Sequence, residues 1–271
     1  MSFSGQTAWI TGASSGIGAA LAKALAKQGA RLVLSGRNLA ALEDVAAECG
    51  EVLVLPFEVT DQAAIGPAVE RAWDWSGGID MLINNAGISQ RSLAVDTSYA
   101  VYQRIIGVDL LAPIALTQAI LPRMAARGSG RFVMISSIAG KVGVPLRTAY
   151  SAAKFGLIGY SDALRAETAH LGLKVHVVTP GSVRTDVSRN ALTADGSPRN
   201  ASDKAIDNGI DPDEAAVAML AAIARDEREI IVAAGPEQAL GEMRRTPEAL
   251  FDQMAGMMTS GYAEKMKAEG N

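Results

Sequence analysis

Short apolar segments alternate with Ala- and Leu-rich segments along this chain of 271 residues. The apolar segments have the length and composition of buried parallel strands. They are residues 7–10, 31–34, 52–57, 81–83, 131–135, 175–178 and 229–232. The helical segments between them are residues 18–28, 39–49, 61–75, 99–127, 149–171 and 212–224. This alternation predicts an α/β fold, a doubly wound parallel sheet of about seven strands flanked by helices.

A glycine-rich turn, TGASSGIG, lies between the first predicted strand and the first predicted helix. Its glycines let the backbone turn sharply and approach a pyrophosphate at a helix N-terminus. A glycine-rich turn alone is also compatible with a purely structural role, but its place between strand and helix favours a dinucleotide site. The candidate cofactor residues in the turn are Gly12, Ser14, Ser15, Gly16, Ile17 and Gly18.

A serine, a tyrosine and a lysine form the candidate catalytic group. Tyr150 and Lys154 are four residues apart in a predicted helix, so their side chains share one face. An ammonium beside a phenol favours the phenolate, which suits the phenol to acid–base work. Tyr-x-x-x-Lys alone is compatible with an ordinary surface pair. Together with Ser137 and the glycine turn, it indicates hydride chemistry on a carbonyl or an alcohol, in which Ser137 orients the substrate oxygen.

Five motifs in a fixed order resemble those of the short-chain dehydrogenase/reductase family. They are residues 11–18, Asn84-Asn85-Ala86-Gly87, Ser137, Tyr150-Ser151-Ala152-Ala153-Lys154 and Pro180-Gly181. The resemblance covers residues 6–185 and continues less specifically to about residue 231. It implies a single-domain Rossmann-type fold and a nicotinamide cofactor.

The resemblance also implies roles for individual cofactor-binding residues. Tyr150 and Lys154 would lie against the nicotinamide ribose, and the backbone of Val183 and the hydroxyl of Thr185 would hold the carboxamide. The remaining positions are those that would line the adenosine half or the turn after the sixth strand. They are Asn85, Ala86, Gly87, Glu58, Val59, Pro180 and Gly181. At Glu58 the family usually has an aspartate that meets adenine.

The end of the second predicted strand bears on the choice between NAD and NADP. A carboxylate there would bind the ribose 2′-hydroxyl and repel a 2′-phosphate. This chain has Gly36 at that point, followed by Arg37 and Asn38, and a guanidinium is suited to phosphate. An ordinary solvated arginine in a turn fits the same sequence. The missing acid and the adjacent base together predict that NADP(H) is preferred over NAD(H).

Asp109 stands where the family usually has an asparagine that holds a water in the proton relay to the lysine. An aspartate oxygen could hold the same water. If ionised, it would also pair with Lys154 and weaken the effect of that cation on Tyr150. A third interpretation is a helix aspartate that turns away from the site.

Three functions are compatible with these motifs. The predicted one is an NADP(H)-dependent oxidoreductase acting on a small carbonyl or secondary alcohol, with Tyr150 as acid or base. A redox sensor or scaffold that binds the nucleotide without turnover is the alternative, favoured only by Asp109. A sugar-nucleotide epimerase or dehydratase shares Tyr-x-x-x-Lys but usually has a longer C-terminal domain.

The expected organisation is one domain, residues 1–235, with a substrate lid at about residues 184–211. Residues 236–271 are predicted to form a Met-rich helical tail that packs on the same domain or on a partner subunit. The two long helices, 99–127 and 149–171, suggest a homodimer or homotetramer.

Composition limits the partners and the compartment. A hydrophobic content of 49% supplies a sizeable core, and a net charge of −4 argues against a nucleic-acid surface. Cys49 is the only cysteine, so no internal disulfide can form and a cytoplasmic location is expected. No His, Cys and carboxylate residues have metal-ligand spacing, so no metal is expected. We also expect no apolar stretch of membrane-spanning length.

Overall fold

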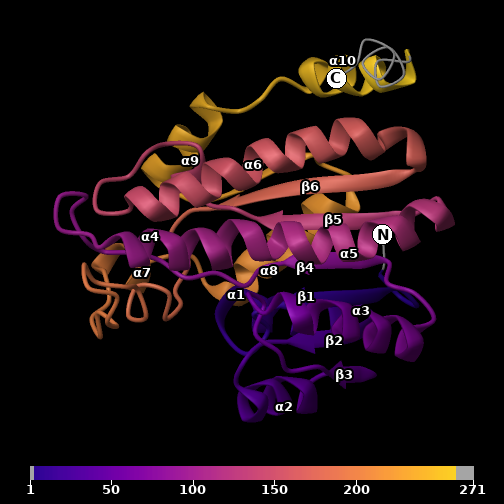
Figure 1. Ribbon diagram of the computed structural model, residues 1–271, viewed down its shortest axis with the longest axis horizontal. Coiled ribbons are helices and arrows are strands. Elements are labelled where there is room, and N and C mark those ends of the chain that lie inside the picture. The colour runs from indigo at the N-terminus through magenta and orange to yellow at the C-terminus, as the bar shows by residue number, and fades with distance from the viewer. Residues whose placement is uncertain (1–2, 261–271) are drawn as a thin grey trace.

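A seven-stranded parallel sheet with strand order β3-β2-β1-β4-β5-β6-β7 forms the centre of the computed structural model, which describes residues 3–260 (Figure 1). The strands are β1 (Thr7–Thr11), β2 (Arg31–Ser35), β3 (Val52–Val54), β4 (Met81–Asn84), β5 (Gly130–Ile135), β6 (Leu173–Pro180) and β7 (Glu229–Val232). The sequence-based prediction of a doubly wound parallel sheet is confirmed. The strand order reverses direction between β1 and β4, which is the place where such sheets bind ligands.

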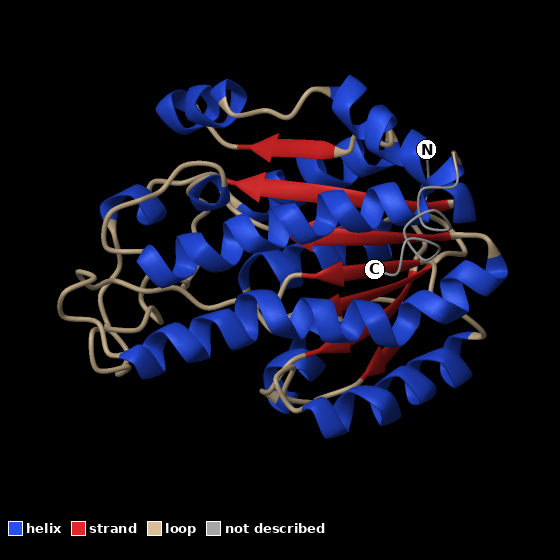
Figure 2. Ribbon diagram, turned by 45° about the horizontal axis from the view of Figure 1, so that its top comes forward, coloured by secondary structure: helices blue, strands red, loops and turns tan. Residues whose placement is uncertain are grey.

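Helices cover both faces of the sheet (Figure 2). The helices of the body are α1 (Gly16–Lys27), α2 (Leu39–Ala47), α3 (Gln62–Ser76), α4 (Tyr99–Ile106), α5 (Ala112–Arg127), α6 (Thr148–Thr168) and α8 (Pro212–Ala224), with short turns η2 (Ile138–Gly140) and η3 (Ala169–Leu171). Side chains alternate across each strand. Ala8 and Ile10 therefore pack in the cluster with α1 and α8, whereas Trp9 packs in the cluster with α3, α5 and α6.

The third strand is shorter than predicted. It ends at Val54 instead of residue 57. Pro56 lacks an N–H group and cannot continue a strand ladder. The chain nevertheless stays beside β2, because the N–H of Leu55 donates to the Leu34 carbonyl and the N–H of Phe57 donates to the Gly36 carbonyl.

The long helix predicted over residues 99–127 contains a π-helical segment, η1 (Gly107–Leu111), between α4 and α5. Pro113 explains it. Proline has no N–H to donate to the carbonyl of Asp109 four residues earlier, so the regular α-helical bond is missing there. The wider turn is centred on Asp109, whose side chain is fully buried.

The same helix corrects the expectation about membrane-spanning length. Over Tyr99–Arg127 it is long enough and apolar enough to cross a membrane, with a mean hydropathy of 1.8 in its most apolar window. In this structure 39% of that window is buried within the protein. Length and composition alone do not distinguish such a helix from the core helix of a soluble protein, which passes the same test.

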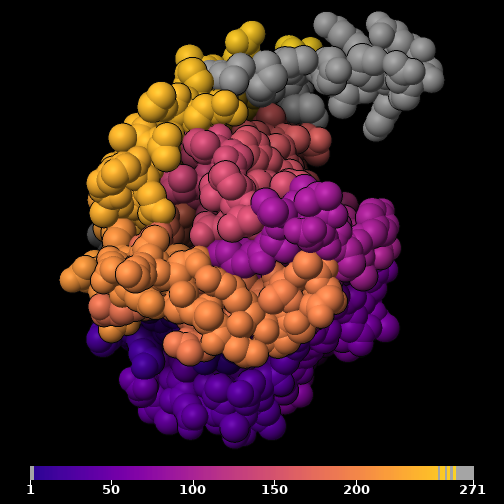
Figure 3. Space-filling view, turned by 90° about the vertical axis from the view of Figure 1, so that its left-hand side faces the viewer, coloured from indigo at the N-terminus to yellow at the C-terminus, as the bar shows by residue number. Residues whose placement is uncertain are grey.

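The predicted lid, residues 184–211, is irregular apart from the short helix α7 (Lys204–Asp207). Figure 3 shows this segment in orange across the face of the molecule that carries the carboxyl ends of the strands. Backbone hydrogen bonds fasten it to the loop after β4. The N–H of Leu192 donates to the Ser89 carbonyl, and the N–H of Arg91 donates back to the Leu192 carbonyl. The segment predicted as a lid is therefore joined to the body by backbone pairing on both sides of Leu192.

The chain after β7 forms α9 (Gly235–Met243) and α10 (Glu248–Thr259). Helix α10 packs along α6 (Figure 1). Its Phe251 is buried, and the guanidinium carbon of Arg165 lies 4.3 Å from the centre of the Phe251 ring. Residues 261–271 and the side chains at positions 250, 254, 257 and 258 lie outside the described part of the structure, so most of the predicted Met-rich surface does too.

A buried ion pair anchors the start of this tail. The ammonium of Lys141, just after η2, meets the carboxylate of Glu229 at the start of β7. The exposed fractions of their side chains are 2% and 5%. The second Glu229 oxygen accepts from the N–H of Thr246 at 2.7 Å, in the linker between α9 and α10. Burying a charged group is costly, so each of these two groups needs the opposite charge of the other to stay ionised inside the protein.

This pair gives a test of stability. Glu229→Leu leaves the Lys141 ammonium buried without its partner, and we expect the free energy of unfolding to fall by about 3–5 kcal/mol. The double variant Lys141→Met/Glu229→Leu removes both charges and should recover most of that loss. Urea unfolding followed by circular dichroism measures both. Glu48→Leu, in the exposed pair with Lys23, is the control and should change little. A double variant no more stable than Glu229→Leu would contradict the explanation.

Candidate active site

The carboxyl ends of the strands open into a cleft with a volume of about 1380 Å³. Most residues predicted from sequence to bind cofactor or act in catalysis lie along its walls. These are Gly12, Ser14, Ser15, Gly16, Ile17, Arg37, Glu58, Val59, Asn85, Ala86, Gly87, Asp109, Ser137, Tyr150, Lys154, Pro180, Gly181, Val183 and Thr185. Gly18 and Asn38 are the predicted residues that do not line it.

The glycine turn is shaped for close approach. Gly12 and Gly16 have φ angles of 64° and 54°, a region that suits glycine. A Cβ atom added to Gly12 would lie 2.8 Å from the Cα of Ala86. Gly18 packs beneath the turn, where an added Cβ would lie 2.3 Å from the Gly12 carbonyl oxygen. Ser15, at the N-cap of α1, makes no side-chain cap, which leaves the helix N-terminus available to an anion. The turn therefore fits a pyrophosphate.

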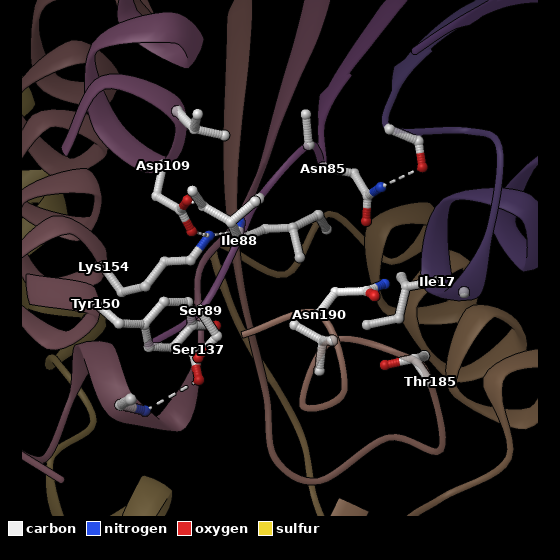
Figure 4. Close-up of a pocket in the computed structure, with 18 of the residues that line it drawn as sticks. Ile17, Asn85, Ile88, Ser89, Asp109, Ser137, Tyr150, Lys154, Thr185 and Asn190 are labelled. Carbon is white, nitrogen blue, oxygen red and sulfur yellow. Dashed lines mark hydrogen bonds and ion pairs between the residues drawn. The ribbon is translucent and has the colours of Figure 1, made fainter. Parts of the chain in front are cut away.

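Asn85 holds the glycine turn in place (Figure 4). Its side-chain amide donates to the carbonyl oxygens of Thr11 at 2.9 Å and Gly12 at 3.2 Å. The hydroxyl of Thr11 in turn accepts from the N–H groups of Asn85 and Ala86. These bonds tie the turn after β1 to the turn after β4, across the point where the strand order reverses.

The end of β2 carries an exposed arginine and has open space beside it. Arg37 is 68% exposed, and its nearest carboxylate is that of Glu58 at 3.7 Å. A Cβ atom on Gly36 would meet nothing closer than the Ser14 hydroxyl at 3.5 Å, so a larger residue would fit there. The side chain of Asn38, predicted to bind cofactor, also has a structural role. It caps α2 by accepting a hydrogen bond from the N–H of Ala41 at 3.2 Å.

The three predicted catalytic side chains converge on one side of the cleft (Figure 4). The ammonium nitrogen of Lys154 lies 5.5 Å from the centre of the Tyr150 ring and donates to the Ile135 carbonyl at 3.0 Å. Ser137 follows β5 at the N-cap of η2, where its hydroxyl accepts from the N–H of Ala139 at 3.1 Å. Tyr150 and Lys154 do share one face of α6.

Asp109 points into the site from the π-helical segment. One carboxylate oxygen accepts from the N–H of Ile88 at 2.9 Å, and the other lies 3.2 Å from the Lys154 ammonium nitrogen. The interpretation that this aspartate turns away is therefore wrong. Burial raises the pKa of Asp109 above its usual range. Burial alone would lower the pKa of Lys154, but the charge and hydrogen bond of Asp109 together with the charge of Tyr150 outweigh it, so the pKa is raised.

A glutamate that the sequence analysis missed supports the turn after β6. Glu237 of α9 accepts from the N–H of Ser182 at 2.6 Å and from the Ser182 hydroxyl at 2.9 Å. A Cβ atom on Gly181 would lie 2.4 Å from the same carboxylate, so the glycine makes this contact possible. Val183 and Thr185, the predicted carboxamide contacts, follow directly. Because Glu237 lies over 50 residues beyond Ser182 in the sequence, no local pattern pointed to it.

Three arginines around one aspartate were also missed. Arg91, Arg147 and Arg199 all form ion pairs with Asp203 in the lid, and Arg91 and Arg147 also line the cleft. Arg91 and Arg147 lie 112 and 56 residues from Asp203 in the sequence, so no local pattern pointed to this cluster. In the described part of the chain, no group of His, Cys, Asp or Glu side chains could hold a metal ion.

Known proteins match this chain over most of its length. A family model described as short chain dehydrogenase matches residues 6–196. Dehydrogenase/reductase SDR family member 7B of Danio rerio is 38% identical over 257 residues, which are 91% of this chain and 83% of that protein. Dehydrogenase/reductase SDR family protein 7-like of Anopheles gambiae is 40% identical over 238 residues, 84% of this chain and 75% of that protein.

Two solved structures have the same architecture. A metagenomic short-chain oxidoreductase in complex with NADP has a TM-score of 0.69 and 32% identity, covering 84% of this chain and 97% of its own. A short chain dehydrogenase/reductase from Burkholderia phymatum in complex with NAD has a TM-score of 0.77, covering 85% and 90%. Its 23% identity supports the fold alone. The match of the family model over most of the chain, together with these relatives, shows that this protein belongs to the short-chain dehydrogenase/reductase family of oxidoreductases.

Proposed function

We propose that this protein is an NADP(H)-dependent oxidoreductase that interconverts a carbonyl and a secondary alcohol. The observation that carries the proposal is the convergence of Ser137, Tyr150 and Lys154 on one wall of a cleft whose other end holds the glycine turn. The cleft fits a dinucleotide, because its turn has no room for a side chain at Gly12 or Gly18 and presents a helix N-terminus. When bound, the nicotinamide would supply or accept a hydride.

Four side chains of the cleft would orient the substrate and transfer the proton. The Ser137 hydroxyl donates a hydrogen bond to the substrate oxygen and orients it. The Tyr150 hydroxyl gives a proton to that oxygen in reduction and takes it back in oxidation. The Lys154 ammonium lies 5.5 Å from the Tyr150 ring and favours its ionised form. Asp109 holds Lys154 from the opposite side, so it fixes the ammonium and also offsets part of its charge.

Substitution of the proton donor tests the proposed function. Tyr150→Phe keeps the ring but removes the hydroxyl, so kcat should fall by roughly 10²–10⁴-fold while cofactor binding is largely kept. Turnover of a panel of aldehydes, ketones and diketones, with cofactor titration by fluorescence, measures both. Tyr160→Phe, at a tyrosine outside the cleft lining, is the matched control and should stay active. Near-normal turnover by Tyr150→Phe would exclude the assigned role.

The charge of Asp109 should be visible in the pH dependence. Asp109→Asn keeps the shape but removes a negative charge beside Lys154, so the phenolate of Tyr150 becomes easier to form. The rise of kcat/KM for alcohol oxidation with pH should therefore occur at lower pH. The Asp109 charge also raises the pKa of Lys154, so the variant should lose that proton at lower pH as well.

The measurement is the pH profile of kcat/KM for wild type and Asp109→Asn. Asp96→Asn, at an exposed aspartate outside the cleft, should leave the profile unchanged. A profile of Asp109→Asn that moves to higher pH would contradict the electrostatic argument.

The preference for NADP(H) rests on the end of β2. Arg37 borders the cleft, no carboxylate is present at Gly36, and a solved relative binds NADP. Glu58 lies 3.7 Å from Arg37, so a 2′-phosphate would compete with this carboxylate for the guanidinium. Because Arg37 is 68% exposed, solvent and salt screen its interactions.

Two variants test the cofactor preference. Arg37→Ala removes the phosphate partner, and Gly36→Asp adds a carboxylate where an added Cβ meets no close contact. A charge-assisted hydrogen bond contributes about 1.5–3 kcal/mol, so a preference of roughly tenfold or more for NADP(H) should be lost in Arg37→Ala. Gly36→Asp should favour NAD(H). Fluorescence titration at low and high salt measures the dissociation constants. Equal affinities for the two cofactors in wild type would refute the preference.

A homo-oligomer and a cytoplasmic location remain part of the proposal. Leu111, at the end of η1, and Phe155 of α6 are large apolar side chains with exposed fractions of 55% and 37%. A second copy of this chain would cover them, and analytical ultracentrifugation checks its presence. The cytoplasmic location rests on Cys49, a free thiol. Fractionation of cells checks the compartment, and recovery with membranes would count against it.

A further inference from the structure

Two arginines from separate segments meet in the substrate half of the cleft. Arg91 lies in the loop after β4, and Arg147 lies at the N-cap of α6. Their side chains are 7% and 25% exposed, and both form ion pairs with Asp203 of the lid. Arg199 pairs with the same carboxylate from within the lid. One carboxylate therefore serves three guanidinium groups, which leaves two uncompensated positive charges.

The hydrogen bonds of the two cleft arginines leave donors free. Arg91 uses Nε for Asp203 at 2.7 Å, and Nη1 for the Ser89 hydroxyl at 2.8 Å and the Gln90 carbonyl at 2.7 Å. No hydrogen bond among the described residues uses its Nη2. Arg147 contributes only Nη2, at 3.4 Å from Asp203. A buried guanidinium with a free donor that lines a cleft is suited to an anion.

The backbone places Arg147 close to the reacting group. Arg147 precedes Tyr150 by one helical turn. Leu146 before it has a φ angle of 65°, an unfavourable conformation for a branched side chain. A hydrogen bond from the N–H of Ser92 to the Leu146 carbonyl, at 3.1 Å, holds this conformation. Strained residues of this kind cluster at ligand sites.

The other charged residues around Arg91 and Arg147 do not neutralise the excess positive charge there. Asp203 itself does not line the cleft; Asp186 is the acidic residue of segment 184–211 that does, and it pairs with Arg189 at 3.4 Å. Arg104 of α4 adds a further positive charge to the wall. Burial lowers the pKa of Arg91, and repulsion from Arg147 lowers it further, whereas Asp203 acts in the opposite direction. An anion between the two arginines would relieve their repulsion.

We infer that the substrate carries an anionic group, a carboxylate or a phosphate, which Arg91 and Arg147 bind while the carbonyl lies at Tyr150. This inference rests on the proposed function and names the class of its substrate. The competing explanation is that the cluster only fastens the lid. Arg199 separates the two, because it pairs with Asp203 and the Ser188 hydroxyl but does not line the cleft.

The test compares charged and neutral versions of the same ketone. The substrates are 4-oxopentanoate, 5-oxohexanoate and 6-oxoheptanoate, each against its methyl ester, and the phosphate monoester of 4-hydroxy-2-butanone against the free alcohol. We expect kcat/KM for at least one anion to exceed that of its neutral partner by roughly tenfold or more. The carboxylate and phosphate arms distinguish the two anions.

Three variants test which arginine causes the preference for the anionic substrate. Arg147→Gln should remove this preference. Arg225→Gln deletes the same charge from an exposed surface pair outside the cleft lining and should keep it. Arg199→Gln should change the acid and the ester equally, because it affects only the lid. If Arg147→Gln does not fold, as judged by circular dichroism, Arg147→Lys keeps the charge without the planar fork and should lose most of the preference.

Calorimetry separates this inference from the proposed function. The same oxo acids and the phosphate monoester are titrated into the NADP(H)-bound protein. Binding that Arg147→Gln abolishes, without turnover of any ketone, would overturn the proposed function and support the anion site. Turnover of neutral ketones with no anion preference and no measurable anion binding would overturn the anion site alone. A preference that survives intact in Arg147→Gln would overturn it as well.

Discussion

The buried pair of Asp109 and Lys154 organises the active side of the cleft. Its two members bring together four elements, because Asp109 accepts from Ile88 after β4 and Lys154 donates to Ile135 at the end of β5. The side chain of Asp109 is 0% exposed and that of Lys154 is 5% exposed. Burying either ionised group without the other would therefore be costly. The pair also requires a glycine nearby, since a Cβ on Gly87 would lie 3.0 Å from the Asp109 carboxylate.

Hydrogen bonds from distant parts of the chain hold the other walls of the cleft in position. Asn85 fixes the glycine turn from the neighbouring strand, and Glu237 fixes the turn after β6 from a helix beyond β7. Gln90 accepts from the N–H of Ala149 and so caps the first turn of α6, the helix that carries Tyr150 and Lys154. Each contact satisfies a polar group that is partly or fully buried. The site is therefore held by the scaffold before any ligand binds.

The sequence predicted the sheet, the glycine turn and the Tyr150–Lys154 pair because these depend on local patterns. Apolar runs define strands, and Tyr-x-x-x-Lys needs only helical spacing. The features that the sequence left open or missed share a cause. The direction of Asp109 depends on a π-helical turn next to Pro113, and the capping bond of Asn38 depends on where α2 begins. The partners of Asp203 come from segments up to 112 residues away, which no local pattern reveals.

The two ends of the cleft differ in how strongly they can discriminate by charge. Arg37 at the cofactor end is 68% exposed and shares its surroundings with Glu58, so its attraction for phosphate is weakened by water and salt. Arg91 at the other end is 7% exposed, and its charge acts in a medium of lower polarity. Arg91 therefore discriminates between charged and neutral ligands more strongly than Arg37 does, although the two carry the same charge. Mobile ions should affect the choice of cofactor more than the choice of substrate, because Arg37 faces solvent and Arg91 is almost wholly covered by protein.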